Sequence, residues 1–219
     1  MTLLPIIQRE LLSRSRNQAT YWARSAVALV GVLVCLQSLT IAFAAPTMMG
    51  RYVFNGVLTA AFIVSCFVVF LTADAICAER REGTLELLFV TRVRPLDVLL
   101  GKLSSTGLTS LCALAGFLPI LMVPVLAGGV TGGEAFRKSL ALLNTTFLAL
   151  VAGLCASAAQ RERFRAVRKG LALLGLVLIS PFLAYVVTAG GPVHQLGVLS
   201  PLVTLSAAND LAYAASPGF

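Results

Sequence analysis

The chain has 219 residues, of which 58% are hydrophobic and only 12% are charged, and its mean hydropathy is +0.91. A soluble domain has about 45–50% apolar and about 25% charged residues, so this composition excludes a soluble protein and indicates an integral membrane protein. The net charge of +8 comes from basic segments that lack the aromatic interleaving of a nucleic-acid reader, so we expect no nucleic acid among the partners.

Residues 1–22 are expected to form an amphipathic helix that lies in the membrane interface. Pro5 fits its first turn, and Glu10 and Arg14 form a favourable i,i+4 pair. The sequence Ala42-Phe43-Ala44 resembles a signal-peptide cleavage site, but the apolar run before it approaches about 20 residues, longer than the usual ~7–15. We therefore expect this segment to be retained. The apolar side chains that share one face of the helix are Leu3, Leu4, Ile6, Ile7, Leu11 and Leu12.

Five apolar runs come close to the ~20 residues that a helix needs to cross the ~30 Å hydrocarbon core. Runs such as residues 171–179 are continuously apolar, unlike the alternating strands of a membrane barrel. The predicted fold class is therefore an all-α integral membrane protein, with its transmembrane domain over residues 23–189. The five predicted spans are residues 25–45, 52–77, 103–127, 139–159 and 170–189.

Basic residues fall almost entirely on one side of the predicted spans. Of the 17 Lys and Arg residues, 14 lie in the N-terminal segment and in the loops after the second and fourth spans. The remaining three, Arg51, Arg137 and Lys138, lie on the other side. By the positive-inside rule the first side, with the N-terminus, is cytoplasmic.

Residues that could carry chemistry are sparse. The five cysteines lie in or at the ends of spans without C-x-x-C spacing, and His194 is the only histidine. No G-x-x-x-x-G-K-[ST] phosphate loop occurs, and no span carries a charge at its middle. We expect no metal, no cofactor and no enzymatic activity in this chain. Asp74 is either an interface carboxylate or a latch, and Pro119 and Pro124 interrupt the third span as a fixed kink or as a hinge.

The segment Glu79 to Lys102, between the second and third spans, is too highly charged to lie in hydrocarbon. Gly83 can take the left-handed conformation that ends one helix, Thr84 is a good N-cap for the next, and Glu86 favours its positive N-terminal end. The side chains of Leu85, Leu88 and Phe89 share one face by helical spacing, which suits either a groove on a partner or the surface of the bundle.

The run Glu79-Arg80-Arg81-Glu82-Gly83-Thr84-Leu85-Glu86-Leu87-Leu88, followed by Thr91, Arg94, Pro95 and Gly101-Lys102-Leu103, resembles type-2 ATP-binding cassette exporter permeases. The resemblance implies a transport subunit in lipid, in a bacterial inner membrane, that pairs with an identical or different second permease. It also implies a separate cytoplasmic ATPase subunit, which would hold ATP and magnesium. The residues expected to couple the chain to that ATPase are Glu82, Gly83, Thr84, Leu85, Glu86, Leu88 and Phe89.

The sequence departs from this family after the fifth span. Such permeases commonly have six spans, whereas residues 190–219 resemble the partly re-entrant external segment that precedes the sixth, and we expect that last span to be missing here. Two other classes of protein stay open: a membrane-embedded enzyme such as a protease or acyltransferase, and a non-transporting scaffold or assembly factor. Co-purification of a cassette ATPase distinguishes the exporter from both.

Overall fold

The computed structural model describes residues 18–42, 49–73, 76–77, 83, 95–160, 162–187 and 200–210. The described parts are helices joined by turns and contain no strand, so the predicted all-α class is confirmed. The elements are α2 (Gln18–Ala42), α3 (Met49–Ala73), α6 (Pro95–Ala115), α7 (Leu118–Leu126), α8 (Gly132–Ala159), α9 (Arg163–Val187) and α10 (Pro201–Ala207).

Four stretches are long and apolar enough to cross a membrane, so this is a multi-pass membrane protein. They are Met49–Ala73, Leu100–Leu126, Gly132–Ala159 and Arg163–Leu183, and they correspond to the second to fifth predicted spans. The first predicted span falls in α2, whose apolar part, Ser25–Thr40, is shorter. Because α2 begins at Gln18, it also includes the last residues of the range expected for the interfacial helix.

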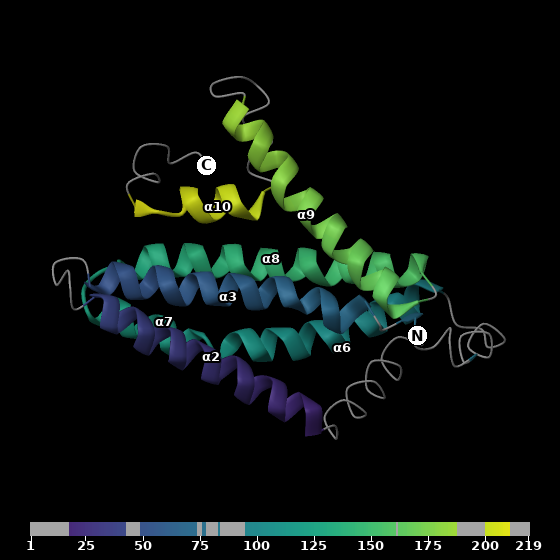
Figure 1. The fold of residues 1–219 in the computed structure, drawn as a ribbon, viewed down its shortest axis with the longest axis horizontal. Helices are drawn as coiled ribbons and strands as arrows, with labels where there is room; N and C mark the ends of the chain where they lie inside the picture. Colours follow the sequence, from purple (N-terminus) through teal and green to yellow (C-terminus); the bar gives the residue numbers. More distant parts are fainter. Residues whose placement is uncertain are drawn as a thin grey trace.

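α3 and α8 lie side by side at the centre of the bundle, with α2, α6 and α7 on one side and α9 and α10 on the other (Figure 1). Half or more of each central span is buried, against 28% of the α6–α7 span and 22% of α9. α9 leans away from α8 towards its C-terminal end, and α10 lies beside α8 in the space this opens (Figure 1).

The contact between α3 and α8 is close because small residues line it. A Cβ atom placed on Gly153 of α8 would lie 1.9 Å from the Thr72 hydroxyl oxygen of α3. Elsewhere in the same contact, the Thr146 hydroxyl donates to the Ser65 hydroxyl at 3.1 Å or to the Leu142 carbonyl of its own helix at 2.8 Å, and Ser65 donates to a carbonyl of its own helix. Small residues at the contact and hydroxyls bonded within the helix are how membrane helices pack without leaving polar groups unsatisfied.

The third predicted span is two helices rather than one. α6 ends at Ala115, a turn at Gly116 and Phe117 follows, and α7 begins at Leu118. Pro119 lacks an N–H and its ring would clash with the carbonyl of residue 115, so a straight helix cannot pass through it. Pro119 instead occupies the first turn of α7, where a missing N–H costs nothing. Pro124 lies inside α7, which continues to Leu126. The role of the two prolines as a fixed kink or as a hinge stays a prediction.

An apolar groove runs between α8 and the α6–α7 pair. Two hollows of about 360 and about 230 Å³ follow one another along it and share Leu111 and Leu143 in their walls. The first reaches back to Leu100 and the second reaches forward to Leu121. At the rise of about 1.5 Å per helical residue, this distance is comparable with the ~30 Å hydrocarbon core.

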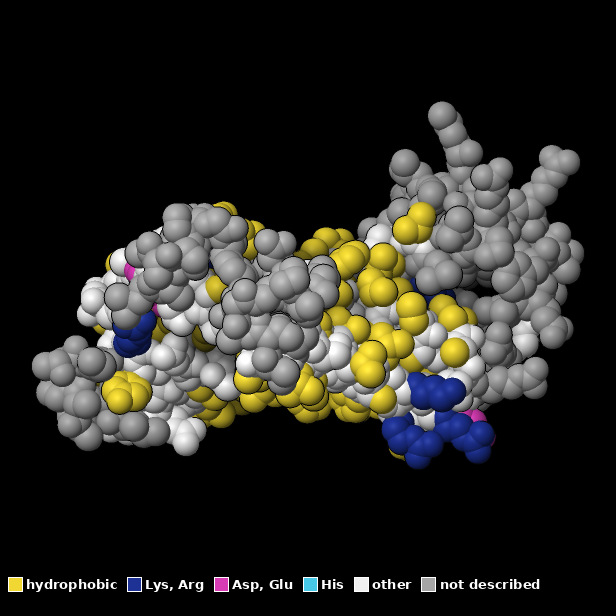
Figure 2. Space-filling view, turned by 90° about the horizontal axis from the view of Figure 1, so that it is seen from above, with side chains coloured by type: hydrophobic (Ala, Val, Ile, Leu, Met, Phe, Trp, Pro, Cys, Tyr) yellow, Lys and Arg dark blue, Asp and Glu magenta, His cyan; other side chains and the backbone are white. Residues whose placement is uncertain are grey.

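Charged side chains lie near the two ends of the molecule, with hydrophobic surface between them (Figure 2). We call one end the Arg165 end, where α3 and α8 finish and α6 and α9 begin. The other is the Arg137 end, where α3 and α8 begin and α7 finishes. The described basic residues at the Arg165 end are Lys102, Arg163, Arg165, Arg168 and Lys169, and those at the Arg137 end are Arg51, Arg137 and Lys138.

Candidate functional site

Among the predicted coupling residues the structure describes Gly83, which is exposed and lies in a turn with φ +70°. The left-handed backbone expected at this glycine is therefore confirmed. Asp74 and the other predicted coupling residues lie outside the described part of the chain, so their roles stay predictions. Those coupling residues are Glu82, Thr84, Leu85, Glu86, Leu88 and Phe89.

At the Arg165 end, the chain that leaves α3 towards Gly83 is bonded to the last turns of α8. The Ser157 hydroxyl oxygen accepts hydrogen bonds from the backbone amides of Ile76, over 2.9 Å, and of Cys77, over 3.1 Å. The Cys77 thiol donates in turn to the carbonyl of Ser157 at 3.4 Å or to that of Gln160 at 3.1 Å. Ser157 and Cys77 are fully buried, so water does not compete for these bonds. We call this set of contacts the Ser157 clamp.

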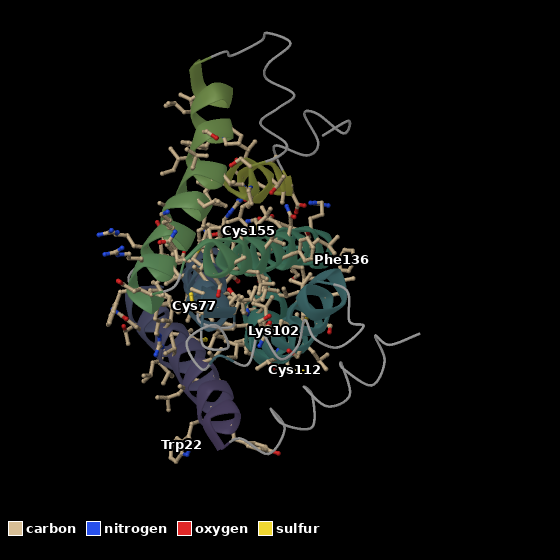
Figure 3. All side chains as sticks on the ribbon, turned by 90° about the vertical axis from the view of Figure 1, so that its right-hand side faces the viewer. Trp22, Cys77, Lys102, Cys112, Phe136 and Cys155 are labelled. Carbon is tan, nitrogen blue, oxygen red and sulfur yellow. The ribbon has the colours of Figure 1, made fainter. Side chains whose placement is uncertain are left out.

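The start of α9 joins the same packing. A Cβ atom on Gly170 would lie 2.8 Å from a Val69 methyl group of α3, and Ala166 packs in a small cluster with Ala73 and Cys77. Lys102, near the start of α6, is 7% exposed, and its carbonyl accepts hydrogen bonds from the hydroxyls of Ser105 and Thr106. Figure 3 looks onto this end and labels Cys77 and Lys102. Helices α3, α8 and α9 therefore meet at Cys77.

A second polar cluster lies at the Arg137 end and contains a buried ion pair. The Lys138 ammonium is 2.6 Å from the Glu134 carboxylate one turn away, and both side chains are less than 5% exposed. Lys138 also donates to the side-chain oxygen of Asn209 over 2.7 Å and lies 5.1 Å from the centre of the Phe54 ring. The second carboxylate oxygen of Glu134 accepts from the backbone amide of Asp210 at 3.4 Å.

Asp210 completes this cluster from the segment that follows α10. Its carboxylate pairs with the Arg137 guanidinium and accepts a hydrogen bond from the Thr131 hydroxyl over 2.7 Å. The Thr131 hydroxyl bond and the charge of Arg137 hold the pKa of Asp210 below its ordinary value, against a smaller opposing effect of desolvation. Thr131 also caps α8, because its hydroxyl oxygen accepts from the Glu134 amide.

The sequence interpretation missed this cluster. It started the fourth span at Ser139 and left Glu134 and Lys138 in an external loop, whereas α8 begins at Gly132 and buries both. The available signal was the pattern Thr131-x-x-Glu134, a capping pair before an apolar run, with Lys138 four residues further on. In the described part of the chain, no group of three His, Cys, Asp or Glu residues could hold a metal ion.

No protein-family model matches the chain, and no curated protein matches it in sequence.

Proposed function

We propose that the chain is the transmembrane permease subunit of an ATP-binding cassette exporter. In this proposal a separate cytoplasmic subunit hydrolyses ATP, a second permease subunit completes the pathway, and the substrate moves along the interface between the two permeases. The Arg165 end faces the cytoplasm, because it holds most of the described basic residues.

The observation that carries this proposal is the Ser157 clamp. In this proposal the motion of the coupling segment is received at Cys77, which is bonded to α8 and follows the end of α3 in the chain. α3 and α8 are the two most buried spans, so a displacement at Cys77 moves the centre of the bundle rather than one peripheral helix. A coupling segment needs such a stiff connection, since a motion of the ATPase can move the membrane helices only if they are displaced together.

The test is to place a charge in the proposed docking face. Leu85→Asp and Leu88→Asp would each leave an unpaired carboxylate at an apolar contact. Both variants should insert normally, yet lose co-purification with the cassette ATPase or hydrolyse ATP without transport.

Leu126→Asp makes the same chemical change at an exposed leucine of the opposite end and should leave both properties unchanged. Normal ATPase binding and transport in both the Leu85→Asp and the Leu88→Asp variant would contradict the proposal, as would a chain purified from its native membrane without any cassette ATPase.

A further inference from the structure

The apolar groove between α8 and the α6–α7 pair has buried residues at its base and partly exposed residues at its rim. Phe117, Leu142 and Leu150 are at most 3% exposed, whereas Leu111 and Leu143 are exposed. The helices that form the groove are long enough to cross the membrane, and its length is comparable with the thickness of the hydrocarbon core. We propose that the groove is a binding site for one acyl chain of a membrane phospholipid. This inference does not depend on the proposed transport function.

The walls of the groove suit a hydrocarbon occupant. Among the described residues that line the two hollows none is charged, and the polar side chains are those of Ser104, Ser139 and Thr146. Each of these hydroxyls has a carbonyl of its own helix within 2.9 Å as an acceptor. An extended peptide in the groove would leave its backbone N–H and C=O groups without partners, and water does not fill apolar hollows. An acyl chain has no polar group to satisfy.

The size of the groove separates an acyl chain from a helix of another protein. A helix with its side chains is about 10–12 Å wide and fills at least roughly 2,400 Å³ over the ~30 Å of the hydrocarbon core. The two hollows measure about 360 and about 230 Å³, so a helix cannot enter the groove. An acyl chain is a single file of methylene groups and fits a long, narrow space of this kind.

Gly107 of α6 keeps the larger hollow open. A Cβ atom at this position would meet a methyl group of Leu150 of α8 at 3.7 Å, an ordinary contact distance. Both residues line the larger hollow, so a side chain longer than a methyl group at position 107 would occupy it. The smaller hollow continues the groove past the turn between α6 and α7, because Ala115, Phe117 and Leu118 all line it.

The fit of the groove, rather than its hydrophobicity, makes it a specific site. Lipid tails are as apolar as leucine, so burial of apolar surface gives no preference for one position around the bundle over another. A chain in the groove is contacted from both sides, by α8 and by α6 and α7, whereas a chain on the outer face of a single helix touches protein on one side. The groove should therefore saturate with one acyl chain.

The experiment adds increasing amounts of phosphatidylcholine with a photoreactive group on one acyl chain to the purified full chain in detergent. After illumination, mass spectrometry locates the adducts. Adducts on the groove walls, within residues 100–121 and 139–150, should reach a plateau at one lipid per chain. Adducts at Leu176, an exposed leucine of α9, should rise in proportion to the added lipid. Phosphatidylglycerol should give the same plateau, because the described residues that line the groove carry no charge.

Two variants fill the groove. Gly107→Leu occupies the larger hollow and Ser139→Leu the smaller one. Since one chain runs through both hollows, each variant should lower the adducts along the whole groove to the level found at Leu176. Gly175→Leu is the matched control, because it makes the same change in α9, where a Cβ meets nothing within 4 Å, and it should leave the groove adducts unchanged. Thermal unfolding in detergent checks that each variant is folded.

Three results overturn the proposal. The groove is not a site if its adducts rise with added lipid as steeply as those at Leu176. No chain lies in the hollows if Gly107→Leu and Ser139→Leu leave the groove adducts unchanged, or if Gly175→Leu lowers them equally. The occupant is a second copy of the protein if the groove carries no lipid adduct and chemical cross-linking joins the groove walls of two chains.

Discussion

At the scale of single residues, the fold depends on glycines at positions where a side chain has no room, and Gly153 is one of them. Gly153 sits so close to Thr72 that an added Cβ would lie 1.9 Å from its hydroxyl oxygen and 2.9 Å from its Cβ. The sequence shows a glycine inside an apolar run, which says nothing about its neighbour. Only the register of α8 against α3 brings these two positions together, and that register is a property of the whole bundle.

Gly153→Ala should therefore destabilise the protein by about 1–3 kcal/mol, the usual cost of forcing an extra methyl group into a packed contact. Gly175→Ala is the matched control, since a Cβ there meets nothing within 4 Å, and its effect should be a stabilisation of up to about 1 kcal/mol. Thermal unfolding in detergent measures both.

A second variant tests whether the loss of stability in Gly153→Ala comes from the clash with Thr72. In the double variant Thr72→Ala/Gly153→Ala the hydroxyl contact is gone while the Cβ contact stays, so part of the lost stability should return. If the double variant loses as much stability as the two single variants together, the two residues do not press on one another.

At the scale of elements, the sequence located the spans better than their ends. Continuous apolar runs place both ends of α3 and the C-terminal ends of α8 and α9 to within four residues, because hydrocarbon demands a helix of a set length. Two features escaped this reasoning. The break in the third span comes at Gly116–Phe117, ahead of the proline that causes it, and α8 starts seven residues before its predicted first residue, Ser139. Hydropathy stops at charged residues and cannot foresee that Glu134 and Lys138 neutralise one another inside the fold.

The stability of the contact between α8 and residues 200–210 should depend on pH only at acidic pH. The pKa of Asp210 is lowered in the folded protein by Thr131 and Arg137, with a further effect of Arg51. A carboxyl group with a lowered pKa stabilises the folded state above its unfolded pKa of about 3.9, and this stabilisation is lost as the pH falls through the lower folded value.

Asp210→Asn should consequently melt at a lower temperature than the parent by a constant difference from about pH 8 to about pH 5, and the difference should shrink below about pH 4. Melting curves at several pH values test this. Asn144→Ala, an exposed polar change in the middle of α8, should show no such pH dependence. A difference that already vanishes near neutral pH would mean that Asp210 is not held by these partners.

At the scale of the whole molecule, the charge pattern along the sequence predicted that basic residues lie at the two ends of the helices. The basic residues named above at the Arg165 end and at the Arg137 end lie at opposite ends of one bundle, as alternating spans require. What the sequence could not supply is the contact between residues 200–210 and the ion pair of Glu134 and Lys138, because residues 134 and 210 are distant in the chain and neither is apolar. Contacts between polar groups leave no periodic signal, so they are found only once the chain is folded.

Labelling of single cysteines in intact cells tests the orientation of the bundle. A cysteine that replaces Glu86 or Arg165 should react only with reagents that cross the membrane. A cysteine that replaces Gly132 or Gly191 should react with reagents that stay outside. The physical reason is the retention of Lys and Arg on the cytoplasmic side during insertion. A thiol at position 165 that reacts from outside would reverse the assignment of both ends.

The walls of the groove between α6 and α8 can be packed against by lipid, which is a liquid, instead of by protein. Leucine side chains in its walls are partly uncovered, such as Leu111, which is 43% exposed, and Leu143, which is 40% exposed. Where the groove faces the bilayer, their remaining dispersion contacts come from acyl chains, which are packed less densely than a protein interior. Chain length and saturation of the surrounding lipid then alter the cohesion of this face directly. The fluidity and thickness of the membrane can therefore change how tightly α6, α7 and α8 are packed on this side of the bundle.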